Sequence, residues 1–443
     1  MAISRRLLLS SAFLPLLSGC AKSLVFLGED TPSVRAIANV AASVAAGNSI
    51  KFVFDPYEQM IIKADTDFAS KTGNFDVVLQ YNTALAGYVR NNYIIPLDQI
   101  GDKAWIDGLS DRLYEKAWKE VGWYQSSTGE PAKPFGVPFS ANTMILCCKR
   151  SLFEDERARS RYQTLHSKEL APPTTWDDFE KIAEFFTTAE TRGVALQGAD
   201  SFIYWEWANF AFGLGGGVMK KPFGWVSDDV TPLILTTDRT IKATELYLRL
   251  KQYSQFDQAG ADFFKTDAAQ QVELMKSGRY AMSIVWSDMV YNLVHGQVSW
   301  SSDYTFHVIP GPVSMLAGGS YYINRQTANR ERVASIIRSL LEFKQQREMA
   351  LIGLCPPRKD IYADDELRRT IPYLSAVGAS LERGVYMLEA GPDAENIGII
   401  LSRTLQEMFR SGEVDNVAAR LSAAEAEIRE RRREILGSIR DKR

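Results

Sequence analysis

Short apolar runs alternate with amphipathic stretches in the first part of the chain. The runs Leu24–Leu27, Ile50–Phe54 and Phe75–Leu79 have the length of buried strands. A helix opens at Pro32 and extends to about Ala46, and a second helical stretch covers Tyr57–Lys71. This strand–helix–strand–helix–strand order predicts a parallel sheet with helices on both faces.

Later segments have the periodicity of helices. Thr175 and Asp178 form a capping-box-like pair ahead of apolar positions spaced three and four apart. Positions 333–341 repeat the same spacing, which is typical of a helix lying on a sheet. Residues 414–440 predict a long charged helix, which contains the run Arg431-Arg432-Arg433 among glutamates. We interpret these arginines as a solvated helix face, with a partner site as the alternative.

The first nineteen residues have the pattern of an export signal. Arg5 and Arg6 precede the apolar run Leu7–Leu17, which is too short to span a bilayer. The run ends in Leu17-Ser18-Gly19-Cys20, which resembles a bacterial lipobox. We therefore expect cleavage before Cys20 and lipid attachment to its thiol, with an ordinary signal and an incidental cysteine as the alternative. The paired arginines also resemble, weakly, a twin-arginine signal.

The remaining chain has the composition of a soluble two-part protein. No other stretch approaches about eighteen apolar residues, so we expect a soluble, tethered chain. The formal charge is −3 for the full chain and −5 without residues 1–19. No basic, aromatic-interleaved stretch indicates nucleic-acid binding. The 424 residues after the signal exceed one ordinary core and predict two lobes.

Three cysteines follow Cys20 in the chain. The neighbours Cys147 and Cys148 are poorly placed to bridge each other, because a disulfide needs specific Cα and Cβ geometry. Two interpretations stay open: three buried thiols, which we favour, or a bridge from one of this pair to Cys355.

Several motifs, in order, resemble the extracellular solute-binding proteins of family 1, which serve sugar and polyol importers. They are Asp76-Val77-Val78, Ile95-Pro96-Leu97-Asp98, Phe135-Gly136-Val137-Pro138, Lys149-Arg150-Ser151-Leu152-Phe153, Pro173-Thr174-Thr175-Trp176-Asp177-Asp178-Phe179, Gly215-Gly216-Gly217, Gly278-Arg279-Tyr280-Ala281-Met282 with Trp286, Gly318-Gly319-Ser320 and Pro357-Arg358. Cys147 and Cys148 replace a Tyr-Asn pair of the family's pattern, so the ligand role of that Asn does not carry over.

The resemblance implies a two-lobe α/β fold of the periplasmic-binding-protein type (type II), with the ligand cleft between lobes joined by crossing hinge strands. We expect residues 20–135 and 304–348 in the first lobe, and residues 136–303 and 349–443 in the second. It also implies a monomeric substrate-binding lipoprotein of an ABC importer, periplasmic or on the cell surface. Its expected partners are a sugar or polyol and the permease's transmembrane subunits, with no cofactor and no metal.

Three loops are expected to line the cleft, because ligands of open α/β sheets lie beyond the carboxyl ends of strands. They are residues 28–31, 55–57 and 80–83. Sugars need flat rings for their C–H faces and fixed polar groups for their hydroxyls. Trp286 is the leading aromatic candidate, with a core tryptophan that ends its strand as the alternative. Trp205 and Trp207 cannot both face one side of a helix, so we expect one of them, Trp205, in the cleft.

The other candidate ligand contacts are polar groups, two tyrosines and two glycines. Each polar candidate has an alternative as a surface residue or helix cap, and Arg358 would clamp a phosphate or sulfonate if the ligand carried one. The glycines would let backbone N–H groups approach the ligand. These candidates are Glu29, Asp30, Asn82, Asn142, Arg358, Tyr57, Tyr81, Gly318 and Gly319.

Two other functions compete with transport. A secreted carbohydrate-active enzyme is the first, but the chain has three histidines and no H-E-x-x-H, G-x-S-x-G or P-loop pattern. Carboxylates are numerous, so counting alone leaves a paired-carboxylate glycosidase open, but no pattern places two of them at one site and the order of the family's motifs argues against an enzyme. The second is a binding lipoprotein that feeds a sensor, which the sequence does not separate from a transport protein.

Overall fold

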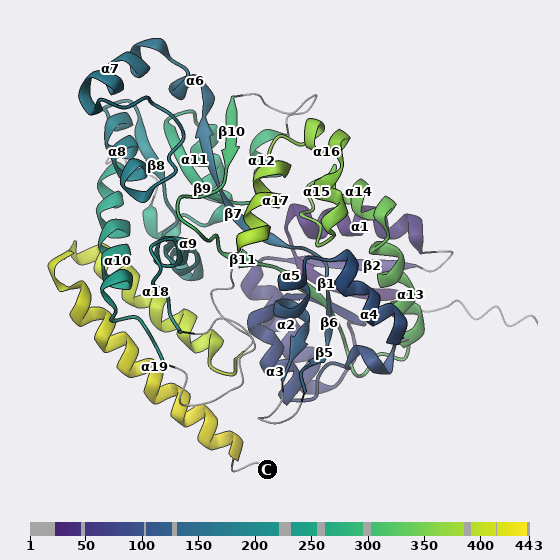
Figure 1. Cartoon of the computed structure of the whole chain (residues 1–443). Helices are drawn as coiled ribbons and strands as arrows, with labels where there is room; N and C mark the ends of the chain where they lie inside the picture. Colours follow the sequence, from purple (N-terminus) through teal and green to yellow (C-terminus); the bar gives the residue numbers. More distant parts are fainter. Residues whose placement is uncertain are drawn as a thin grey trace, which may run out of the picture.

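The computed structural model describes residues 23–45, 49–101, 103–125, 131–220, 232–254, 262–295, 303–384, 391–412 and 414–440. The export signal and Cys20 lie outside the described residues. Two sheets organise the described chain, and helices cover both faces of each (Figure 1). None of the helices in these ranges combines the length and the apolar character that crossing a bilayer requires.

The first sheet has the order β2-β1-β3-β12-β6. Its parallel part is formed by β1 (Leu24–Glu29), β2 (Ile50–Asp55) and β3 (Val77–Tyr81), as the sequence predicts. β12 (Gly319–Ile323) and β6 (Gly136–Pro138) add an antiparallel edge.

Alternate strand residues of the first sheet face two helical layers. Phe26 and Leu79 pack under one layer, whereas Leu27 and Val78 pack under the other. The first layer includes α1 (Pro32–Val44), α4 (Lys103–Arg112), α5 (Glu115–Gly122), α13 (Arg330–Leu340) and α14 (Phe343–Ala350), and the second includes α2 (Tyr57–Ser70) and α3 (Leu85–Arg90). A two-stranded pair, β4 (Trp123–Tyr124) and β5 (Lys133–Pro134), lies beside them.

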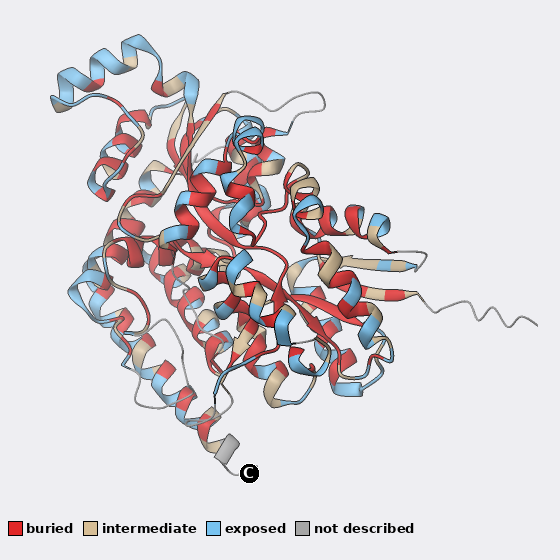
Figure 2. Cartoon of the chain, turned by 45° about the vertical axis from the view of Figure 1, so that its right-hand side comes forward, coloured by how far each residue is buried: buried red, intermediate tan, exposed pale blue. Residues whose placement is uncertain are grey.

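The second sheet has the order β10-β7-β9-β8. These strands are β7 (Asn142–Lys149), β8 (Arg192–Ala195), β9 (Tyr280–Trp286) and β10 (Tyr304–His307), and the short β11 (Leu316–Ala317) pairs with β7. β7 is buried on both faces, and Figure 2 shows buried strands at the centre of the molecule. The edge strand β2 of the first sheet is only partly buried.

Two groups of helices cover the second sheet. One group includes α8 (Trp176–Phe186), α9 (Asp200–Gly213), α10 (Asp238–Leu250), α18 (Ala394–Ser411) and α19 (Val417–Arg440). The other includes α11 (Ala268–Lys276), α12 (Val290–Val294), α15 (Lys359–Ala363), α16 (Asp365–Thr370) and α17 (Leu374–Arg383). α6 (Arg150–Phe153) and α7 (Glu156–His166) project at one end.

The strand pairing shifts two expected lobe boundaries. β6 belongs to the first sheet, so the first crossing lies between residues 138 and 142 rather than after residue 135. β10 pairs with β7 and belongs to the second sheet. The chain therefore returns from the second lobe to the first between residues 317 and 319, rather than before residue 304. Gly318 is the residue between the last strand of one lobe and the next strand of the other.

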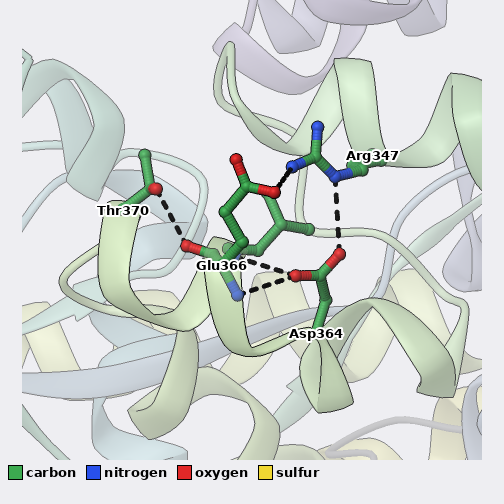
Figure 3. A network of polar contacts seen from close by, with 5 residues as sticks. Arg347, Asp364, Glu366 and Thr370 are labelled. Atoms are coloured by element: carbon green, nitrogen blue, oxygen red, sulfur yellow. Dashed lines mark hydrogen bonds and ion pairs between the residues drawn. The ribbon is translucent and has the colours of Figure 1, made fainter.

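The chain crosses between the lobes a third time between α14, which ends at Ala350, and α15, which begins at Lys359. A polar network joins α14 to the start of α16 beside this crossing (Figure 3). Arg347 of α14 donates to Asp364 at 3.4 Å and to Glu366 at 2.6 Å. Asp364 also caps α16 by accepting from the backbone N–H groups of Glu366 and Leu367. These N–H groups and Arg347 hold the pKa of Asp364 below its ordinary value, so it stays ionised.

The three cysteines are buried free thiols. Cys148 packs under the helices of one face of β7, and Cys147 packs with Cys355 on the other face. The structure therefore has the buried-thiol arrangement, and the bridge to Cys355 is absent among these three residues.

The expectation of a solvated face for the arginines at 431–433 is wrong at Arg432. Its guanidinium donates to Asp393 at 2.6 Å, and the two side chains are 4% and 2% exposed. Arg431 instead pairs with Glu434 at the surface. Arg432 thus anchors α19 to the residue that precedes α18, an ion pair that sequence spacing alone did not indicate.

We expect Arg432→Ala to destabilise the protein strongly and Arg431→Ala to have little effect. Removing one partner of a buried pair leaves Asp393 uncompensated, which costs about 3–5 kcal/mol, whereas exposed pairs contribute about 0–1 kcal/mol. Urea unfolding of both variants measures the difference. Equal stabilities of the two variants would contradict a structural role for the buried pair.

Candidate functional site

A cavity of about 730 Å³ lies between the two lobes. Its first wall is built where the parallel strands end, and each of the three loops expected from the sequence contributes to it. Glu29 and Asp30 follow β1, Tyr57 begins α2 after β2, and Tyr81 ends β3. The strand-end rule therefore places this wall correctly.

The second wall comes from the second lobe. Asn142 begins β7, Trp205 lies in α9, and Trp286 ends β9. Asn142 accepts a hydrogen bond from the Ser287 hydroxyl at 2.8 Å, which fixes its amide beside the end of β9. Asp288 follows directly and is 4% exposed.

Aromatic rings line both walls and meet across the cavity. The ring centroid of Tyr57 in the first lobe lies 5.8 Å from that of Trp205 in the second, and the two rings meet edge-on. The Tyr57 centroid also lies 5.8 Å from the Tyr81 centroid. Trp205 lies 6.0 Å from Trp286, again edge-on. Such contacts fix the ring planes, so the cavity presents flat apolar faces at set angles.

Glu29 is the most perturbed carboxylate in this lining. It accepts a hydrogen bond of 2.5 Å from the Tyr81 hydroxyl. Burial raises its pKa to about 7, the Tyr81 hydrogen bond opposes that rise, and the charges of Asp288, Asp267 and Asp30 add to it. Glu29 therefore titrates near neutral pH.

Eight of the candidate ligand contacts line the cavity: Glu29, Asp30, Tyr57, Tyr81, Asn82, Asn142, Trp205 and Trp286. Trp207 lies in α9 with its Nε1 donating to Thr244 at 2.9 Å, so it packs in the core. Trp286 lines the cavity and also packs in the core, at 8% exposure.

Three candidates are not among the described lining residues. Arg358 is engaged elsewhere: it donates to Asp360 at 2.9 Å and to the Leu341 carbonyl at 2.9 Å, which makes it a structural clamp. Gly319 lies in β12, where a Cβ would meet the Phe139 ring at 2.3 Å, so close packing of strands explains this glycine. Gly318 lies at the lobe crossing.

Sequence reasoning missed Asp267 and Asp288. Asp267 caps α11, accepting from the N–H groups of Ala269 and Gln270, and its D-A-A-Q pattern is a readable capping signal. Asp288 could have been found by applying the strand-end rule to β9. No group of three or more His, Cys, Asp or Glu side chains in the described ranges is arranged to hold a metal ion.

A buried polar network supports the second wall from behind. Glu206, next to Trp205 in α9, accepts from the Gln197 N–H, the Tyr247 hydroxyl and the Gln271 amide at 2.8, 2.8 and 2.9 Å. Burial raises the pKa of Glu206 to about 8, against the effect of these hydrogen bonds. A protonated Glu206 fits because Tyr247 also lies 3.0 Å from the Gln197 carbonyl, to which its hydroxyl can donate while accepting from the carboxyl.

Two lobes that meet at such a cavity and are joined by crossing segments define the architecture of a two-lobe solute-binding protein. The chain belongs to the bacterial extracellular solute-binding proteins, whose family model matches residues 39–371. No curated protein sequence matches the chain significantly.

Solved structures share the fold. A solute-binding protein of an ABC transporter from Agrobacterium radiobacter K84, in complex with ribitol, is 19% identical, with a TM-score of 0.75 over 92% of this chain and 98% of that one. One from Thermotoga lettingae TMO bound to α-D-tagatose is 15% identical, with a TM-score of 0.75 over 93% and 99%. Maltose-bound MalE3 of T. maritima is 13% identical, with a TM-score of 0.74 over 92% and 98%.

We expect Glu206→Gln to be less stable than the wild type at pH 5. The difference in melting temperature between the two proteins should narrow toward pH 9. The pKa of Glu206 rises from its ordinary 4.5 to about 8 on folding, so its stabilising contribution is complete below about pH 4.5 and is lost as the pH rises through 8. The glutamine side chain cannot titrate, and in either orientation its NH2 group faces another hydrogen-bond donor. Melting temperatures at pH 5, 7 and 9 measure the gap.

The exposed Glu169 supplies the control. Glu169→Gln makes the same chemical change at the surface and should stay within about 0.5 kcal/mol of the wild type. A Glu206→Gln gap that is constant or widens with pH would contradict a protonated Glu206.

Proposed function

We propose that this chain is the solute-capturing lipoprotein of an ABC importer for a small polar solute of the sugar or polyol class. The observation that carries the proposal is the cavity whose walls come from both lobes, with aromatic faces and fixed polar groups side by side. The family and the ribitol, tagatose and maltose complexes of proteins with the same fold support it.

Binding proceeds by closure of the lobes at their crossings. Solute entering the open cleft contacts one wall, and closing brings Tyr57 and Trp205 together over it. Because a solute contacts both walls only when the cleft is closed, its binding energy favours that state. The closed form is then the one that the permease subunits recognise. Acylated Cys20 holds the protein at the membrane.

Trp205→Ala should weaken solute binding at least about tenfold and leave the fold intact. The half-buried indole loses a flat face and its contact to Tyr57, a change of the size seen for central aromatic contacts. A thermal-shift screen of sugars and polyols identifies the solute, because a native-state binder raises the melting temperature, and calorimetry then compares the variants.

Trp123→Ala is the matched control, since Trp123 is also half-buried but packs on Trp118 away from the cavity lining. It should keep wild-type affinity. Equal affinity of Trp205→Ala and the wild type would remove Trp205 from the site.

Cys20→Ala should abolish lipid labelling and release the protein from the membrane fraction. Acylation requires the thiol, and the described chain offers no membrane-spanning helix as a second anchor. Metabolic labelling with a fatty acid and fractionation of cells measure both effects. A labelled, membrane-bound Cys20→Ala protein would overturn the lipobox assignment.

A further inference from the structure

Carboxylates dominate the charged groups of the cavity. The described lining contains one basic residue, Lys265. It contains six acidic residues: Glu29, Asp30, Glu58, Asp200, Asp267 and Asp288. A site for a neutral sugar needs a few hydrogen-bond acceptors, but it does not need a surplus of negative charge.

Little of this charge is neutralised within the described chain. Asp30 pairs with Arg35 at 2.5 Å. The ammonium of Lys265 lies 3.4 Å from Asp262, which is outside the lining. No ion pair among the described residues joins Glu29, Asp267 or Asp288 to a lysine or arginine. The lining therefore contains three carboxyl groups, those of Glu29, Asp267 and Asp288, without a cationic partner from these residues, and the charges of the two aspartates act on Glu29.

The aromatic rings of the cavity, like its carboxylates, suit a positively charged ligand. Four aromatic residues line the space: Tyr57, Tyr81, Trp205 and Trp286. Aromatic faces pack against sugar C–H groups, and they also attract cations, most strongly where water is excluded. Carboxylates beside aromatic faces stabilise an ammonium group by both contributions at once.

We propose that the solute is a cation in which an ammonium group takes the place of a hydroxyl: an amino sugar or an amino polyol. The ammonium lies between Glu29 of the first lobe and Asp267 and Asp288 of the second, and the carbon skeleton packs on the rings. This inference rests on the proposed function and specifies its substrate class.

The titration of Glu29 supports this assignment. Its pKa of about 7 reflects burial and the surrounding negative charge, and a cation in the cavity would lower it. Affinity for an ammonium solute should therefore rise between about pH 5.5 and pH 8, with release of a proton on binding. The groups around Glu29 are Tyr81, Tyr57, Asp30, Asp267 and Asp288, with Asp55 of β2 opposite it and paired to Lys63.

Matched solute pairs test the proposal with the chain from Ala21 onward, which contains every described element. The pairs are glucosamine with glucose, galactosamine with galactose, and 1-amino-1-deoxysorbitol with sorbitol. Calorimetry at low salt and pH 7 should give the amine of at least one pair about tenfold higher affinity than its hydroxyl partner, because charge-assisted hydrogen bonds are about twice as strong as neutral ones. For 1-amino-1-deoxysorbitol, an alkyl amine that stays protonated, affinity should rise with pH.

The outcomes separate this proposal from the proposed function. Equal or tighter binding of the neutral partners overturns the cationic solute and leaves a sugar- or polyol-binding protein. Absence of binding by every amine, sugar and polyol tested counts against the proposed function, and the cationic solute falls with it.

Glu29→Gln tests the role of the carboxylate itself. It should lower the amine-over-hydroxyl preference about tenfold and remove most of the pH dependence, while the isosteric amide still accepts from Tyr81. Glu169→Gln removes the same charge at the surface and should change neither. An unchanged preference in a folded Glu29→Gln protein would overturn the assignment.

Discussion

The cavity depends on where the chain passes between the two sheets. The crossings are far apart in sequence, yet they are hydrogen-bonded to one another: the Phe139 N–H donates to the Gly319 carbonyl at 2.8 Å, and the Ala141 N–H donates to the Cys355 carbonyl at 2.9 Å. This arrangement points the carboxyl ends of β1 and β9 at one space. Glu29 and Trp286 therefore reach the same cavity from separate lobes.

Burial raises the pKa of two glutamates in different settings, one inside the second lobe and one at the cavity wall. Glu206 is fully buried, and its carboxyl contacts protein groups only. A proton on it can be donated to the Tyr247 hydroxyl, which in turn donates to the Gln197 carbonyl and completes the network beside α9. Glu29 has the Tyr81 hydroxyl as its partner and otherwise faces the cavity with other carboxylates. A raised pKa is therefore common to both carboxyls, and their hydrogen-bond partners and their position distinguish them.

The sequence predicts the elements and first wall well because local pattern determines both. Apolar runs and helix openings locate β1, β2 and β3, and the rule for parallel strands then points to Glu29, Tyr57 and Tyr81. The pairing of strands that are distant in sequence is not encoded in the local pattern. The observed lobe boundaries therefore differ from the expected ones by one or two strands.

The same limit explains the misplaced side chains. Arg358 resembles a ligand clamp in sequence, but Asp360 and the Leu341 carbonyl occupy its guanidinium. Arg432 has the pattern of a surface arginine, but Asp393, thirty-nine residues away, makes it an interior one. For Arg432 the deciding partner is distant in sequence, whereas Arg358 is held both by a neighbour two residues away and by a carbonyl seventeen residues away.

The proposed closure of the cleft would bring opposing contributions together. The contact of Tyr57 with Trp205 favours closed lobes, whereas Glu29 approaches Asp267 and Asp288 of the other lobe and like charges repel. A neutral solute adds hydrogen bonds and leaves this repulsion in place. An ammonium group between the walls converts it into attraction, and it does so only when the lobes are closed. Since a ligand shifts a conformational equilibrium by its difference in affinity for the two states, the same carboxylates would select the solute and drive closure.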